Sequence, residues 1–150
     1  MKRLMLPTLV LAATSLGGNL LYGQEAEIRQ VVQSTFVAWN TGDVDAFNSH
    51  FMPKVHGFFL DDGQLIKGIG PAEEMRASYA SGYKPNVTLR DITIEVYGNT
   101  AVVASYVDGT VMTTEKKLYT GPWRFTETLV RDGGRWKAIQ WHFSRLAPQT

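Results

Sequence analysis

Apolar residues recur at helical spacing near the start of the chain. Ile28, Val32, Phe36 and Trp39 follow one another at intervals of three or four residues, which is the period of one face of an α-helix. Neighbouring apolar positions widen this face to the width expected of a helix that packs on a core. The pattern therefore predicts a long, core-facing helix over residues 25–41.

Two shorter helices are predicted from their end signals. Gly42 stops the first helix, and Asp43 supplies the N-cap of a second helix that runs from Val44 to about Phe51. Pro71 stands at the favoured first position of a third helix, with two glutamates in its first turn, and Gly82 ends it. The three helices are expected in the first half of the chain.

The other apolar segments alternate with the period of two that is typical of β-strands. A change of phase near Arg90-Asp91 predicts a bulge, whereas Asp108-Gly109 fits either a bulge or a turn. Helices followed by a meander of strands predict an α+β fold, with the helices on one face of a strongly curved antiparallel sheet. The predicted strands are residues 55–60, 65–67, 87–97, 100–107, 123–131 and 136–145.

The last predicted strand is apolar on both faces, which is typical of a strand that is covered on both sides. Strict alternation places Ile139, Trp141 and Phe143 on one face, and Trp136, Ala138, Gln140, His142 and Ser144 on the other. The helices can cover only one of these faces. A homodimer through the face that carries Ala138, Gln140 and His142 is therefore expected.

The first residues resemble an export signal rather than part of the domain. Lys2 and Arg3 precede an uncharged apolar run from Leu4 to Leu16, and small residues follow at Gly17, Gly18 and Gly23. This run is shorter than the roughly 20 apolar residues of a membrane-spanning helix. We therefore expect a signal peptide over residues 1–23, a domain over residues 24–150, and export to the periplasm or the extracellular space without membrane insertion; an uncleaved anchor or a buried helix is the alternative.

Composition excludes several classes of function. The net charge is +1 and no basic run occurs after the first residues, so binding to nucleic acid is not expected. The chain has no cysteine, which removes disulfides, metal thiolates and thiol nucleophiles. His50 and His56 lack the spacing of a zinc site, and no motif predicts a metal or another cofactor.

Two segments resemble a known family. Residues 36–43 (FVAWNTGD), followed by Ala46-Phe47 and Phe51, resemble the opening helices of SnoaL-like and ketosteroid-isomerase-like domains. Residues 126–144, with the turn RDGGRW and the ending His142-Phe-Ser144, resemble their last hairpin. The resemblance covers roughly residues 25–146 and implies a cone-shaped, nuclear-transport-factor-2-like (cystatin-like) fold, commonly dimeric, whose pocket opens at the mouth of the cone.

The resemblance also implies which side chains face this pocket. A mostly apolar small molecule is the expected ligand, held among aromatic side chains with one polar anchor. The expected ligand-binding residues are Trp39, Phe58, Tyr79, Trp123, Glu127, Trp141 and Phe143.

Catalysis by this family's isomerases needs a carboxylate base and two donors for an enolate, a tyrosine and a protonated carboxylic acid. The resemblance places the tyrosine at Thr35 or Phe36, neither of which is a phenol, and the base at Leu60 or Asp61. It places the donor carboxyl at Glu127. The set is incomplete, so the resemblance does not by itself imply this reaction.

Three candidate acid–base residues follow. Glu127 is the best, because it alternates with large apolar side chains of one strand; a shift of one residue would instead put it outside, beside Lys137 or Arg124. Asp61 is weaker because a surface turn also explains it. His142 titrates near neutrality but is expected on the dimer face.

Three functions therefore remain open. The favoured one is an exported, non-catalytic domain that binds a small ligand. The second is an isomerase, cyclase or hydrolase that uses acid–base chemistry in the same pocket. The third is a dimerisation or protein-docking domain whose cone is filled by side chains. A second buried carboxylate, tyrosine or histidine beside Glu127 would favour the enzyme.

Overall fold

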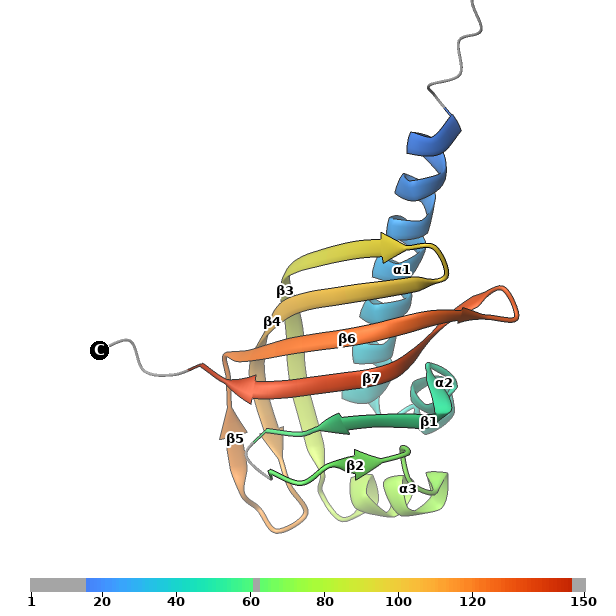
Figure 1. Cartoon of the computed structure of the whole chain (residues 1–150). Helices are drawn as coiled ribbons and strands as arrows, with labels where there is room; N and C mark the ends of the chain where they lie inside the picture. The colour runs from blue at the N-terminus through green and yellow to red at the C-terminus, as the bar shows by residue number, and fades with distance from the viewer. Residues whose placement is uncertain (1–15, 61–62, 147–150) are drawn as a thin grey trace, which may run out of the picture.

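The computed structural model describes residues 16–60 and 63–146, and their side chains from Tyr22 onward. Figure 1 shows three helices and a curved sheet within these residues. The helices are α1 (Leu16–Thr41), α2 (Val44–Ser49) and α3 (Ala72–Ala80). The strands are β1 (Phe51–Phe58), β2 (Ile66–Lys67), β3 (Lys84–Tyr97), β4 (Thr100–Met112), β5 (Leu118–Thr120), β6 (Trp123–Asp132) and β7 (Arg135–Arg145).

The strands form one seven-stranded sheet in the order β2-β1-β7-β6-β4-β3, with β5 paired to β4. The predicted α+β architecture, three helices packed on a curved sheet, is confirmed. The sheet is mixed rather than wholly antiparallel, because β1 pairs with β7 in parallel. A parallel pair needs a long connection, and here the whole chain between the two strands supplies it.

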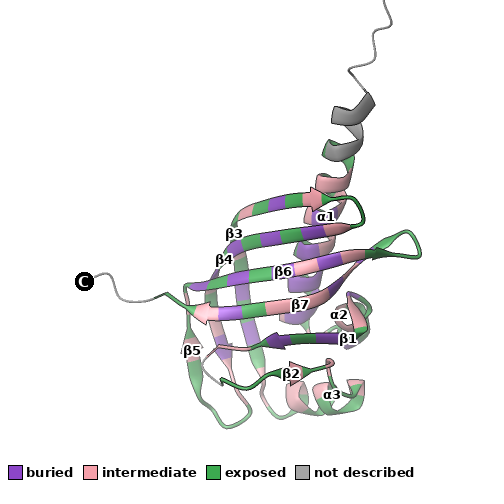
Figure 2. Cartoon of the chain, in the orientation of Figure 1, coloured by how far each residue is buried: buried purple, intermediate pink, exposed green. Residues whose placement is uncertain are grey.

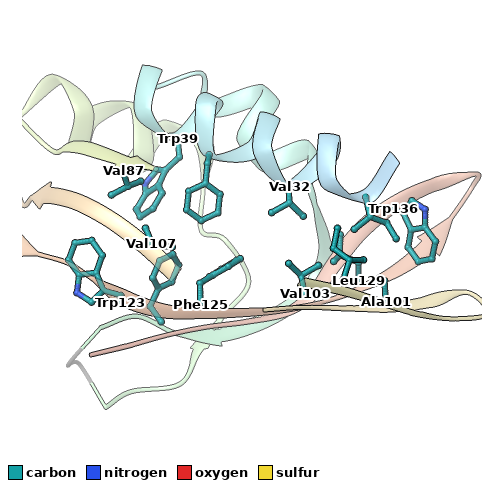
Figure 3. Close-up of a cluster of buried hydrophobic side chains, with 14 of the residues drawn as sticks. Val32, Trp39, Val87, Ala101, Val103, Val107, Trp123, Phe125, Leu129 and Trp136 are labelled. Carbon is teal, nitrogen blue, oxygen red and sulfur yellow. The ribbon is translucent and has the colours of Figure 1, made fainter. Parts of the chain in front are cut away.

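Helix α1 lies across the concave face of the sheet and supplies much of the core (Figure 2). Figure 3 shows Val32 and Trp39 of this helix facing Val103, Phe125 and Leu129 of the sheet. The helix begins at Leu16, earlier than the expected residue 25, and thus overlaps the segment expected to be a signal. The expected cleavage of the signal stays a prediction.

The ends of the short helices follow the sequence signals. The carboxylate of Asp43 accepts a hydrogen bond from the backbone N–H of Ala46 at 3.1 Å, which confirms it as the N-cap of α2. Pro71 occupies the N-cap of α3, one position before its first helical residue. The compact turn between α1 and α2 brings the end of α2 against the sheet, where the backbone N–H of Ala138 donates to the carbonyl of His50 at 2.9 Å.

Two irregularities shape the β3–β4 pair. The predicted bulge is confirmed, because the register shifts between Arg90 and Thr93 and Asp91 has a φ of 54°. At Gly109 strand β4 continues without a turn, up to Met112. A Cβ atom on Gly109 would lie 2.1 Å from the carbonyl oxygen of Asn86, so the close approach of the two backbones requires glycine here.

The prediction for the two faces of β7 was wrong for the first half of the strand, because Trp136 and Ala138 lie on the same face as Trp141 and Phe143 and not opposite them. Thr128 pairs with Gln140 but Leu129 pairs with Ala138, so Ile139 is an extra residue that forms a bulge. The bulge reverses the alternation, and Trp136 and Ala138 face the core with 2% and 0% exposure. Ala138 therefore cannot belong to a dimer face.

Two side chains of α1 reach the outer edge of β3, which ends the sheet. The amide of Asn40 donates to the carbonyl of Val87 at 2.7 Å and accepts from the N–H of Val87 at 2.9 Å. The guanidinium of Arg29 donates to the carbonyl of Ile92 at 3.3 Å. Helix and sheet are thus joined by hydrogen bonds from side chains of α1 to the backbone of β3, as well as by the core.

Candidate functional site

A cavity of about 220 Å³ lies between α1 and the sheet, where α2, α3 and the start of the β1–β2 segment border it. Most of its walls are apolar, and much of the lining is aromatic. The lining residues are Thr35, Phe36, Trp39, Phe47, Phe51, Phe59, Ile66, Gly68, Ile69, Met75, Tyr83, Phe125, Glu127, Trp141 and Phe143. Such a surface suits an apolar ligand.

The aromatic wall is held by edge-to-face and tilted contacts between rings. Phe36 of α1 meets Phe125 of β6 edge-on, with ring centroids 5.2 Å apart. Phe125 in turn lies 4.8 Å from Phe143 of β7, and Phe143 lies 6.2 Å from Trp141. Contacts of this kind favour one arrangement of each ring, so the cavity is bounded by rings that support one another.

A buried hydrogen bond joins His50 and Glu127. The Nε2 atom of His50 lies 2.8 Å from Oε1 of Glu127, and each side chain is only 2% exposed. The other polar atoms of the pair, Nδ1 of His50 and Oε2 of Glu127, have no hydrogen-bond partner among the described residues. The pair shares one proton in its hydrogen bond. Nδ1 of His50 and Oε2 of Glu127 can each form one further hydrogen bond.

The two residues reach each other from distant parts of the chain. Glu127 lies between Phe125 and Leu129 on the inward face of β6, so the inward orientation considered from the sequence is the one observed. His50 is the C-cap residue of α2, and the ring of Phe51 stands edge-on to its imidazole at 4.9 Å. The sharp entry from α2 into β1 points the imidazole at the carboxylate.

Tyr83 is a second polar group in the cavity wall. The indole N–H of Trp39 donates to the Tyr83 hydroxyl at 3.0 Å, which leaves the phenolic proton free for another acceptor. Burial raises the pKa of Tyr83 above its ordinary value. Tyr83 is therefore a neutral phenol at neutral pH, and its hydroxyl can donate a hydrogen bond to a bound molecule.

Four of the seven residues expected to bind a ligand line the cavity: Trp39, Glu127, Trp141 and Phe143. Phe58, Tyr79 and Trp123 do not, and their expected placement needs correction. Phe58 is 38% exposed and its ring contacts His142. Successive side chains of β1 point to opposite faces of the sheet, and Phe58 is on the outward face.

Tyr79 and Trp123 are structural residues near the cavity. The hydroxyl of Tyr79 donates to the backbone carbonyl of Trp39, and its ring contacts Tyr83. Burial raises the pKa of Tyr79 to about 12. Trp123 is 1% exposed at the start of β6, where it packs against Gly121 rather than into the cavity.

Of the two weaker acid–base candidates, only His142 lies within the described residues, and it is away from the cavity. His142 is exposed, beside Phe58, and pairs across the ladder with Thr126. Asp61 lies outside the described residues. His142 is therefore not part of the site around Glu127.

Sequence reasoning missed His50 and Tyr83. His50 was considered only as a zinc ligand, and its partner is 77 residues away, so no local spacing indicates the pair. Its only local signal was an imidazole near the end of the predicted second helix. Tyr83 follows the helix stop at Gly82, a position that the sequence indicated as a loop.

Two further properties hold for residues 16–60 and 63–146. No group of three histidine, cysteine, aspartate or glutamate side chains stands close enough together to hold a metal ion. No helix within these ranges combines the length and the apolar character that crossing a membrane requires.

The family model of the SnoaL-like domain matches residues 28–148. The chain belongs to the SnoaL-like family. The match spans α1 through β7, and so includes both His50 and Glu127. No curated protein shows a significant match to the chain.

Solved structures support the fold of this SnoaL-like domain. An NTF2-like protein with a cystatin-like fold from Novosphingobium aromaticivorans is 19% identical, with a TM-score of 0.65 and coverage of 92% of both chains. The association domain of CaMKII from C. elegans is 22% identical, with a TM-score of 0.64 and coverage of 82% of this chain and 96% of that one. A ketosteroid isomerase-like protein from Erwinia carotovora atroseptica is 15% identical, with a TM-score of 0.62 and coverage of 82% and 96%. The expected NTF2-like, cystatin-like fold is thereby confirmed.

Proposed function

We propose that this SnoaL-like domain binds a small, mostly apolar molecule in its cavity and moves a proton on that molecule through Glu127. The observation that carries the proposal is the 2.8 Å hydrogen bond between Glu127 and His50, buried at the wall of a mostly apolar cavity. A histidine within reach of Glu127 is the feature that favours an enzyme over a simple binding module. The similarity to a protein described as ketosteroid isomerase-like agrees with this choice.

The chemistry follows from the three polar side chains. Oε2 of Glu127 has no hydrogen-bond partner among the described residues, so this oxygen can take a proton from a bound molecule. His50 holds the other oxygen and fixes the direction of the carboxylate. Tyr83 has a phenolic proton to donate to a ligand oxygen. A proton next to a carbonyl group is therefore the substrate feature that suits this set.

The walls limit the class of substrate. The cavity of about 220 Å³ is smaller than the site of a drug-sized ligand. Its lining offers aromatic surface and, among the described residues, a single carboxyl group. A small cyclic ketone without charged substituents is the best match, since a charged group would lose its hydration without gaining a partner.

The proposal can be tested by hydrogen–deuterium exchange on such ketones. The protein is incubated in deuterated water with 2-tetralone or 2-cyclohexenone, and exchange of the hydrogens next to the carbonyl is followed by NMR. Glu127→Gln keeps the shape but not the base, so we expect it to lower the catalysed rate by about 10²- to 10⁴-fold. The matched control is Glu95→Gln on an exposed position of β3, which should keep the wild-type rate.

The result that would contradict the proposal is equally specific. Wild-type protein that binds these ketones but exchanges none of their hydrogens would be a binding module. That second candidate is favoured by the incomplete enolate site, because the positions that the resemblance assigned to a tyrosine hold Thr35 and Phe36. If Glu127→Gln then binds these ketones with an affinity within about tenfold of the wild-type value, the domain is a binding module.

We also propose that the convex face of the sheet pairs two copies of the chain. Val102 and Tyr106 of β4 and Phe58 of β1 are 37–41% exposed there. Ala104 and Thr126 face each other between them and carry no charge. The similarity to an association domain supports self-association, and a closed two-fold interface is the commonest form of it.

Export remains part of the proposal. It is supported by the basic start and the uncharged apolar run of the first residues. A small apolar compound met in the periplasm or outside the cell is accordingly the expected substrate.

A further inference from the structure

We infer that Met75 sets the upper size of the molecule that the cavity accepts, and that this limit lies at two fused six-membered rings. The inference rests on the proposed function, because it narrows the class of ketone that reaches Glu127. It also gives a role to helix α3, which the proposed chemistry does not otherwise use.

One side of the cavity is fixed by its own packing. Phe36, Phe125 and Phe143 line the cavity and belong to the hydrophobic core. The ring centroids of these three side chains are 4.8–6.2 Å apart. A ring that moved away from the cavity would have to displace the next ring, and a close-packed interior resists such a shift. This side therefore gives little room to a larger ligand.

The other side comes from the segment between β1 and β3. Ile66, Ile69 and Met75 line the cavity and are partly buried, but none of them is among the described side chains that pack against the core cluster. Ile66 and Ile69 belong to a stretch with little regular structure, in which β2 is two residues long. Such a stretch yields to a ligand more readily than an anchored helix does. Met75, on α3, is therefore the side chain of this side that limits the space.

Helix α3 holds Met75 in place relative to α1. One turn after Met75, the hydroxyl of Tyr79 donates to the backbone carbonyl of Trp39, and residues four apart lie on the same face of a helix. A Cβ atom on Gly42 would lie 3.1 Å from the ring of Tyr79, so this ring packs closely on the end of α1. Figure 1 shows α3 at the periphery of the molecule, after β2 in the chain. The Met75 side chain thus occupies a set part of the cavity.

The volume of the cavity agrees with this limit. At the packing density of protein interiors, about 0.75, a cavity of about 220 Å³ holds about 165 Å³ of ligand atoms. Two fused six-membered rings with a carbonyl group fit this volume, and a third fused ring exceeds it. Replacing Met75 by alanine removes three heavy atoms, nearly as many as the four carbon atoms that a third ring adds. Met75→Ala should therefore raise the limit by about one ring.

The test compares affinities within a series of three uncharged ketones. The probes are 2-cyclohexenone, 2-tetralone and the analogue of 2-tetralone with one more fused benzene ring, so the series has one, two and three rings. Isothermal titration calorimetry gives the Kd of each ketone for the wild-type protein and its variants. We expect the wild type to bind 2-tetralone at least about tenfold more tightly than the three-ring ketone, and Met75→Ala to reduce this ratio by about tenfold.

A larger side chain should have the opposite effect. Met75→Trp should weaken the binding of 2-tetralone by roughly tenfold and leave that of 2-cyclohexenone within about twofold of the wild-type value. Helix α3 has no buried residue, so both variants should keep the wild-type midpoint of urea unfolding. Where one of them does not fold, the other decides.

The matched control is Met112→Ala, which removes the same atoms from a partly buried position of β4 outside the cavity. It should leave every affinity ratio within about twofold of the wild-type value. A ratio in Met75→Ala that also stays within about twofold would overturn the inference. So would wild-type protein that binds the three-ring ketone as tightly as 2-tetralone, an unchanged affinity for 2-tetralone in Met75→Trp, or an equal change of ratio in Met112→Ala.

Binding is measured without turnover, so the result separates the inference from the proposed function. A protein that exchanges no ketone hydrogens but shows the reduced ratio in Met75→Ala would disprove the proposed function and leave the size limit in place. Ketone exchange that Glu127→Gln abolishes, together with an unchanged ratio in Met75→Ala, would do the opposite. Wild-type protein that binds none of the three ketones would disprove both.

Discussion

Breaking the single hydrogen bond between His50 and Glu127 should substantially lower the free energy of unfolding. Both side chains are 2% exposed, and the 2.8 Å bond is the only one that either side chain makes to the described residues. Replacing one partner by alanine leaves the other buried without a hydrogen bond. We expect His50→Ala and Glu127→Ala each to lower the free energy of unfolding by about 3 kcal/mol.

The double variant separates pairing from packing. Removing both partners leaves no orphaned polar group, so its cost should fall short of the sum by about 2 kcal/mol. The expected total is then about 4 rather than about 6 kcal/mol. Urea unfolding followed by the fluorescence of the four tryptophans measures each value, provided that all variants share one m-value.

The exposed pair of Arg76 and Asp45 supplies a control, since its side chains are 49% and 82% exposed. The same cycle there should give a coupling below about 1 kcal/mol. Costs at His50 and Glu127 that add within about 0.5 kcal/mol would refute the reasoning. The hydrogen bond would then contribute nothing beyond the packing of its two side chains.

Four other outcomes are expected. Ala104→Arg on the convex face should give a monomer in sedimentation, because two like charges would meet across a two-fold axis; a dimer would place the interface elsewhere. Gly57→Ala should lower the free energy of unfolding by about 1–3 kcal/mol, because its Cβ would lie 2.4 Å from the ring of Trp141; an unchanged urea midpoint would contradict the rigid wall. Burial raises the pKa of Tyr79 to about 12 and that of Tyr83 in the same direction. The stability that these two phenols contribute is therefore complete below about pH 10, the ordinary pKa of tyrosine, and is lost as the pH rises above it. Ultraviolet titration should show two of the six tyrosines ionising late. Exported protein should have an intact mass short by roughly 15 to 23 residues, and full-length protein in the membrane would contradict cleavage.

The fold could be predicted because its signals are local. The stripe of α1, the cap at Asp43 and the phase change at Arg90 each depend on residues a few positions apart. Glu127 could be named for the same reason, since its strand alternates without a break. The faces of β7 could not all be predicted, because a single extra residue at Ile139 reverses the alternation, and Ala138 was consequently assigned to the dimer face.

The rest of the site depends on contacts between distant segments. His50 meets Glu127 because α2 ends against the sheet and β1 pairs with β7 in parallel. No spacing along the chain indicates either event. Tyr83 becomes a donor in the cavity through its bond with Trp39, 44 residues away. Sequence patterns thus identify which strand faces inward, whereas the partners on that face follow from tertiary packing.

The side chains of Asn40 and Arg29 bear on the solubility of the protein. Strand β3 ends the sheet, and a free strand edge is a template on which another chain can add and begin aggregation. The amide of Asn40 occupies both backbone groups of Val87 on this edge, and Arg29 occupies the carbonyl of Ile92. A foreign strand would have to displace the side chains of α1 at two points before it could pair. The helix that encloses the cavity therefore also guards the sheet against fibril-like growth.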